Sequence, residues 1–302
     1  TAAASLGMAL ARLGRRTLIL ETDTYSAMED LFDFRSRGLE TVKVGPNLWA
    51  SNLLAEDCFV ATLKRFVPSE RIARAVINNR IARVFFKAAP SVNEVTILDQ
   101  VRVFFEEERD GEPAYDHIIV DLPASGHAVT FLNVPATMHG MMRGVGPIAT
   151  MANQVAGLIR DEKTTAIVAV CLPEEMPVNE TIELAQNLKT VLNRSLSLAI
   201  VNMVHHAPIK GHHRDVFDRL REDIARDKTS AGHGIGRLVE GNALALDWHD
   251  RDLKYLDILH EKLEDIVVEV PVFFESAGSE IVDRVASFLI NADNENDEVL
   301  AS

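Results

Sequence analysis

The chain has 302 residues, and Lys plus Arg number 31 against 45 for Asp plus Glu, which gives a net charge of −14 at pH 7. This excess of negative charge repels a phosphate backbone, so we expect no nucleic-acid partner. The 2 cysteines, Cys58 and Cys171, are too few for a disulfide framework, and no apolar run approaches the roughly 20 residues of a membrane-spanning helix, so we expect a cytoplasmic protein.

The first predicted elements are a helix and two strands. TAAASLGMALARLG (1–14) is rich in Ala and Leu, which favours a helix already under way at Thr1. TLILETD (17–23) is an apolar run short enough to be a fully buried strand, and WASNLLA (49–55) is a second strand candidate. Residues 59–110 then show a mostly helical pattern. We therefore predict a helical insertion between strands.

The rest of the chain alternates between apolar runs and helical patterns. The predicted strands are HIIVDLP (117–123), TAIVAVCLP (165–173), LSLAIVNMV (196–204) and IVVEVPVF (266–273). A final helix is predicted over 279–291, followed by a frayed acidic tail. Alternation of this kind predicts an α/β fold with a doubly wound, mostly parallel sheet that helices cover on both faces. We expect a single domain over 1–302.

Polar side chains stand where three of these strands end. Glu21-Thr22-Asp23 ends the first strand, Asp121 ends a later one, and Asn202 ends another. Ligands of open parallel sheets collect beyond the carboxyl ends of the strands, where a carboxylate can hold hydrated Mg²⁺ or orient a water. An Asp near a Pro is also a common way for a chain to leave a sheet, so Asp121 alone leaves both interpretations open.

Several segments together resemble a known family. DLPASGHAVTFLNVP (121–135) is similar to the switch II segment of the arsenite-pump (ArsA) and Get-pathway ATPases, and ETDTYSAMEDLFD (21–33) is similar to their switch I. VCLPEEMPVNETIEL (170–184) and IVNMV (200–204) resemble two later segments of that family. VEVPVFFE (268–275) is a weaker match to the loop that closes over adenine. The resemblance implies a P-loop NTPase-like fold and hydrolysis of ATP to ADP and phosphate.

The resemblance also implies roles around the triphosphate. Asp23 would position the attacking water, and Asp121 would reach Mg²⁺ through a water. Gly126 would let the switch II backbone approach the γ-phosphate. TAAASLGMALA matches the helix that follows the family's phosphate-binding loop. Thr1 would therefore contact the α-phosphate, as the last residue of a loop that we expect to precede this numbering.

The base of the nucleotide would be held elsewhere in the chain. Asn202 would hydrogen-bond the adenine edge, and Pro271 would belong to the loop that closes over adenine. The implied cofactors are therefore ATP and Mg²⁺.

The resemblance further implies a partner-facing region. The helical stretches 59–110 and 138–160 correspond to the family's variable part, which faces a protein or membrane-associated partner or a second subunit. Methionines in or near the second stretch could line an adaptable apolar groove or could belong to the core; they are Met138, Met141, Met142 and Met151. We expect a homodimer or a paired homologue, because this chain would supply one nucleotide site.

Other interpretations remain open at this point. The loop HHAPIKGHHR (205–214) carries His205, His206, His212 and His213, which could bind a transition metal or form a solvated surface loop. A partitioning or site-selection ATPase would share the fold, although the acidic charge and the switch II pattern disfavour it. A scaffold that holds nucleotide without hydrolysing it is the alternative from another class.

Overall fold

The computed structural model describes the chain except residues 23–25, 37, 67–89, 123–124, 142, 144–145, 227–233, 264–265, 275–277 and 300–302. It divides into two compact units. The first comprises Thr1–Ala166, Gln186–Ser195 and Glu275–Ser302, and the second comprises Ile167–Ala185 and Leu196–Phe274. None of the helices in the described part of the chain combines the length and apolar character that crossing a membrane requires.

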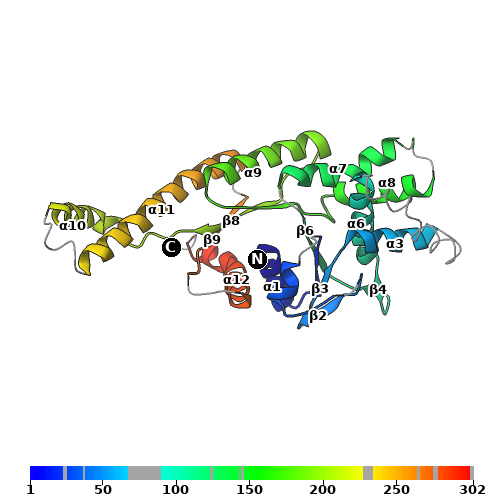
Figure 1. Ribbon diagram of the computed structural model, residues 1–302, viewed down its shortest axis with the longest axis horizontal. Coiled ribbons are helices and arrows are strands. Elements are labelled where there is room, and N and C mark those ends of the chain that lie inside the picture. The colour runs from blue at the N-terminus through cyan, green and yellow to red at the C-terminus, as the bar shows by residue number, and fades with distance from the viewer. Residues whose placement is uncertain are drawn as a thin grey trace. The chain divides into compact units, whose positions relative to one another are not determined.

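The first unit is built on a four-stranded sheet in the order β2-β3-β1-β6 (Figure 1). The strands β3, β1 and β6 are parallel, and β2 pairs antiparallel with β3 at the edge. All residues of β1 are buried, as expected for an apolar run in the middle of a parallel sheet. The bounds are β1 Thr17–Glu21, β2 Val42–Gly45, β3 Leu48–Asn52 and β6 His117–Asp121.

Two helices that are distant in sequence pack together in the first unit. Helix α1 (Ala2–Arg12) packs against β1, β6 and α12 (Ser279–Val299). Arg12 forms an ion pair with Asp283 and a hydrogen bond with Ser287 of α12. The acidic tail expected to be frayed is helical as far as Val299.

Four further helices of the first unit form a group of their own, seen together in Figure 1. Helices α3, α7 and α8 each contact α6, and α7 also contacts α8. Their bounds are α3 Ala55–Phe66, α6 Pro90–Phe105, α7 Ser125–Met141 and α8 Pro147–Arg160. A short hairpin of β4 (Glu108–Arg109) and β5 (Glu112–Pro113), which the sequence pattern did not predict, follows α6. A helical insertion between β3 and β6 is therefore present.

The second unit contains a three-stranded parallel sheet in the order β7-β8-β9. Helix α11 packs against β8 and β9, and a cluster of buried apolar side chains joins it to α10. The strands are β7 Val168–Cys171, β8 Leu198–Val204 and β9 Val267–Pro271. The helices of the second unit are α9, η2 Gly211–His213, α10 Arg214–Arg226 and α11 Ile235–Leu263. Helix α9 Glu175–Asn187 begins in this unit, and the following η1 Leu188–Leu192 belongs to the first unit.

The α/β class with mostly parallel sheets is confirmed. The strands predicted from residue 17 to residue 273 are present, each trimmed by a few residues at its ends. The strands of the two larger sheets belong to different compact units. The single domain over 1–302 stays a prediction.

Candidate functional site

The carboxyl ends of β1 and β6 lie at the same edge of the four-stranded sheet. The two strands are parallel neighbours, with Glu21 paired to Asp121 in the register. Beyond the strand, the hydroxyl of Thr22 donates a hydrogen bond of 2.9 Å to the backbone carbonyl of Asp121. Asp121 is half-buried. Asp23, the predicted catalytic residue, lies outside the described residues, so its relation to Asp121 stays a prediction.

Glu21 has a role that the sequence interpretation missed. Its side chain is 5% exposed, and its carboxylate accepts hydrogen bonds from the Ser26 hydroxyl and from the backbone N–H groups of Ala27 and Met28. These groups form the start of α2 (Ala27–Leu31). Glu21 therefore anchors the segment that follows Asp23. The signal was a Glu in an otherwise apolar strand, with an N-cap Ser shortly after it.

Thr1 and Gly126 both lie at starts of helices in the first unit. Thr1 is the exposed N-cap residue of α1, and its carbonyl accepts hydrogen bonds from the backbone N–H (2.9 Å) and the hydroxyl (3.0 Å) of Ser5. Gly126 is in the first turn of α7. A helix start presents unpaired backbone N–H groups, which suit an anion.

The position of α1 depends on a glycine within it. A Cβ on Gly7 would lie 2.5 Å from Cδ1 and 2.7 Å from Cγ1 of Ile19, which is fully buried in β1. A Cβ at this position would force the Ile19 side chain to shift, so Gly7 allows the helix to lie directly on the strand. The start of α1, at Thr1, is thereby held against the same sheet that carries Asp121.

Asn202 and Pro271 lie near the same end of the sheet in the second unit. Val204 of β8 pairs with Pro271 of β9, and the backbone N–H of Val272 donates to the carbonyl of Val204 at 3.0 Å. The register between the two strands shifts between Val201 and Val204, so Asn202 lies in an irregular stretch. The structure thus brings these two predicted base-binding residues to adjacent strand ends within one unit.

The histidine-rich loop does not gather its imidazoles at one point. His205 is half-buried and bonded to Asp252, with 2.7 Å between its Nδ1 and the carboxylate. His206, His212 and His213 are exposed. Within the described ranges, no group of three or more His, Cys, Asp or Glu side chains is placed to hold a metal ion.

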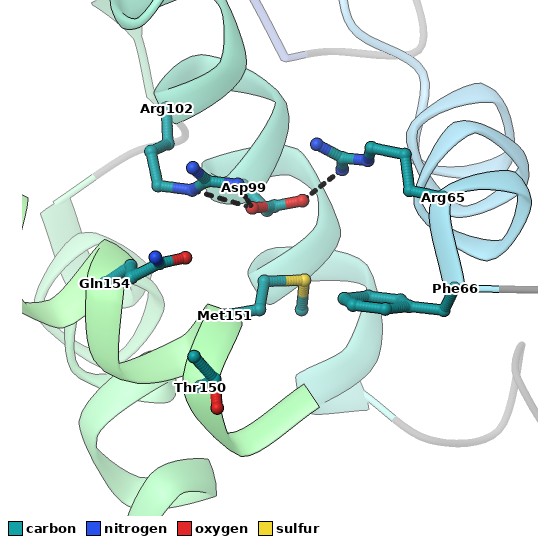
Figure 2. A pocket seen from close by; sticks show the side chains of 7 residues that line it. All are labelled: Arg65, Phe66, Asp99, Arg102, Thr150, Met151 and Gln154. Atoms are coloured by element: carbon teal, nitrogen blue, oxygen red, sulfur yellow. Dashed lines mark hydrogen bonds and ion pairs between the residues drawn. The ribbon is translucent and has the colours of Figure 1, made fainter. Parts of the chain in front are cut away.

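Helices α3, α6 and α8 of the first unit line an open pocket of about 360 Å³, shown in Figure 2. In the wall of this pocket the buried carboxylate of Asp99 forms ion pairs with Arg65 and Arg102. Met151 belongs to a buried apolar cluster, so this methionine is core as well as pocket wall. The lining residues all fall within the stretches 59–110 and 138–160; they are Arg65, Phe66, Asp99, Arg102, Thr150, Met151 and Gln154.

Both cysteine thiols are buried, Cys58 in the first unit and Cys171 in the second. Burial raises the pKa of the Cys58 thiol to about 12, with the charge of Asp57 adding to the effect. Burial also raises the pKa of Cys171, against a hydrogen bond from Thr181 that lowers it. Since the thiolate is the nucleophile and the metal ligand, neither cysteine is prepared for soft-metal binding.

A family model described as anion-transporting ATPase (ArsA ATPase) matches residues 1–159. This range includes the β1 and β6 strand ends, and Asn202 and Pro271 lie beyond it.

Curated relatives agree with the family match. The chain is 27% identical over 240 residues to ATPase BagA of Mycobacterium tuberculosis, covering 77% of this chain and 68% of the relative. It is 21% identical over 249 residues to ATPase ASNA1 homolog 2 of Paramecium tetraurelia, covering 68% and 71%. A putative arsenical pump-driving ATPase of Halobacterium salinarum is 22% identical over 218 residues, covering 67% of this chain and 33% of the relative.

Proposed function

This chain belongs to the anion-transporting (ArsA) ATPase family, with its P-loop NTPase-like α/β fold and its hydrolysis of ATP, and from that premise we propose a Mg²⁺-dependent nucleotide switch coupled to a partner. The partner would be a protein or a membrane-associated assembly. Two copies of the chain, or one copy and a paired homologue, would supply the two nucleotide sites.

The single observation that carries this proposal is the parallel register of β1 with β6. It brings the strand-ending carboxylate Asp121 to the edge from which the segment containing Asp23 departs. Asp121 fits a Mg²⁺ ion, because that ion takes oxygen ligands and the carboxylate is half-buried at the carboxyl end of a parallel strand. When bound with the nucleotide, the ion would neutralise phosphate charge.

The remaining roles around the triphosphate belong to this chain's own groups. Asp23 would orient the attacking water, since phosphoryl transfer depends mainly on in-line placement and electrostatic stabilisation. The start of α1 at Thr1 and the start of α7 at Gly126 would direct backbone N–H groups towards phosphate oxygens. Because Gly126 is helical, loss of the γ-phosphate would act directly on α7, the first helix of the switch II segment.

The base would bind at the carboxyl end of the sheet in the second unit. Asn202 carries an amide with both a donor and an acceptor, which matches the N6 donor and the ring-nitrogen acceptors of adenine. Pro271 ends the neighbouring strand β9, and the segment after it would close over the base. The adjacency of these strand ends supports this assignment.

The nature of the partner follows from two features. The thiols of Cys58 and Cys171 are buried and protonated at neutral pH, which disfavours a metalloid cargo held by thiolates. The pocket around Asp99 lies within the predicted partner-facing stretches 59–110 and 138–160. Together these features support a protein or membrane-associated partner.

Phosphate release by the full-length protein tests the catalytic assignment. We expect Asp23→Asn to lower kcat by about 100-fold or more, in the range typical of a residue that assists proton transfer. Asp33→Asn is the matched control, because Asp33 is exposed and its φ of 49° is one that Asn tolerates. Equal turnover by wild type and Asp23→Asn would remove Asp23 from the mechanism.

Magnesium dependence and assembly are tested separately. Chelation of divalent ions should abolish phosphate release, and Asp121→Asn should raise the Mg²⁺ concentration needed to restore it. Turnover that persists in excess chelator would contradict the metal assignment. Light scattering should give about twice the mass of one full-length chain, or the mass of a mixed dimer with a homologue. A monomer with full activity would contradict the two-site proposal.

A further inference from the structure

Side chains of α11 bind both the backbone N–H and the backbone carbonyl of His205, the residue directly after β8. Asp252 Oδ2 accepts a hydrogen bond of 2.8 Å from the backbone N–H of His205. His249 Nδ1 lies 2.7 Å from the backbone carbonyl oxygen of His205. A carbonyl oxygen can only accept, so His249 Nδ1 carries the hydrogen and donates it. We call Asp252, His249 and His205 the α11 clamp.

The ring of His205 is fixed as firmly as its backbone. Its Nδ1 lies 2.7 Å from Asp252 Oδ2, so one carboxylate oxygen contacts both the main chain and the ring. Trp248 lies 5.1 Å and Phe274 6.1 Å from the imidazole, measured between ring centroids. Rotation of His205 would therefore break a hydrogen bond and two aromatic contacts.

Asp252 itself is an unusual residue to find in this position. It is 0% exposed, and Arg251 donates to its second oxygen at 2.8 Å and 3.2 Å. A carboxylate in a dry interior costs free energy unless donors surround it, and here the donors are Arg251 and His205.

The α11 clamp lies next to the irregular end of β8. Between Val201 and Val204 the pairing with β9 shifts, and Met203 has a φ of 64°. A non-glycine residue rarely adopts that region, and it persists there only where its surroundings enforce it. The α11 clamp acts at the next position after this stretch, and Asn202 lies inside the stretch.

We propose that Asp252 and His249, acting through His205, are positioning residues for the nucleotide base. They hold the end of β8 in the irregular conformation that presents the Asn202 amide to the base edge. This inference rests on the proposed function, in which Asn202 reads adenine. Neither Asp252 nor His249 contacts the nucleotide.

The readout is the ratio of the dissociation constants for GDP and ADP. An Asn amide can pair with the donor and acceptor of adenine, whereas guanine presents two acceptors at the corresponding positions. Displacement of Asn202 therefore weakens ADP binding more than GDP binding. Partial unfolding would weaken both to the same extent, so the ratio separates positioning from a merely structural role.

The experiment is calorimetric titration of the full-length protein with ADP and with GDP. We expect His249→Phe, which keeps a ring but loses the donor, to lower the GDP/ADP ratio by about tenfold, as for the loss of one good base contact. Asp252→Asn should act in the same direction. The matched controls on α11 are His260→Phe and Asp250→Asn, because neither residue contacts His205 and both are partly exposed. They should leave the ratio unchanged.

The outcomes distinguish this inference from the proposed function. If Asn202→Ala lowers the ratio but His249→Phe and Asp252→Asn do not, the clamp is structural and the inference is overturned. If wild type binds ADP and GDP equally, or Asn202→Ala has no effect, the assignment of Asn202 fails first. If Asp252→Asn does not fold, His249→Phe decides alone, because it leaves the buried carboxylate and its Arg251 partner intact.

Discussion

Replacement of Glu21 by Gln is the most direct test of how the strand end anchors the following segment. The Glu21 carboxylate accepts from the Ser26 hydroxyl, from Ala27 N at 3.0 Å and from Met28 N at 3.3 Å. An amide offers one acceptor oxygen and turns an NH₂ group towards these donors, so the backbone N–H of Ala27 or of Met28 loses its acceptor. That loss costs about 1–3 kcal/mol, and removal of the negative charge from the helix start adds about 0.3–1 kcal/mol.

We therefore expect the free energy of unfolding of the first unit to fall by about 2 kcal/mol. The chain has 2 tryptophans, Trp49 in the first unit and Trp248 in the second, so a Trp248→Phe background makes fluorescence report the first unit alone. In urea, with a slope of about 2 kcal/mol/M, the midpoint should fall by about 1 M. The exposed Glu40→Gln is the control. A Glu21→Gln midpoint equal to that of the control would refute the capping role.

Three further predictions concern packing, pH and thiol reactivity. Gly7→Ala should lower the free energy of unfolding by about 1–3 kcal/mol, because the new Cβ would lie 2.5 Å from Cδ1 of Ile19. Urea denaturation should show that stability recovers in part when Ile19→Val is added. A Gly7→Ala variant as stable as wild type would contradict the close packing. Arg16 donates to the Asp116 carboxylate and lowers the pKa of Asp116 to about 2. The stability that this pair contributes is therefore present above the pKa of Asp in the unfolded chain, about 3.9, and is lost as pH falls through the pKa of the folded state. The difference in urea midpoint between wild type and Asp116→Asn should thus shrink from about pH 5 to about pH 2, and a constant difference would oppose this reasoning. Burial raises the pKa of the Cys58 thiol to about 12. Mass spectrometry should therefore find no iodoacetamide adduct on Cys58 in the native protein at about pH 8, and a full adduct on Cys58 in urea. Rapid labelling of Cys58 in the native protein would contradict this prediction.

Six of the strands in the described part of the chain were predictable, because each is a short apolar run that indicates a strand in any tertiary setting, whereas the edge strand β2 was not predicted. β1 and β6 were both expected, and so was the carboxylate that ends β6. Adjacency of the two strands was not encoded locally, since about 100 residues separate Thr22 from the Asp121 carbonyl that it contacts. The resemblance to a known family supplied that connection before the structure did.

Roles that depend on burial could not be read from residue type. Glu21 belongs to the predicted strand-end set, yet its carboxylate caps α2 because the fold turns Ser26 back towards it. His205 belonged to a predicted loop, and only packing of α11 against β8 brings Asp252 to it. The hairpin β4-β5 was also missed, because each strand has 2 residues and carries no periodic signal.

The sequence by itself determined the α/β class, the position of most strands along the chain and the family to which the chain belongs, because hydrophobic runs and local motifs are properties of contiguous residues. Tertiary structure alone decided which polar groups meet: Asp99 lies 34 residues from Arg65, and Asp252 lies 47 residues from His205. A buried charge must find its donors wherever the packed elements supply them, and no local pattern specifies those donors.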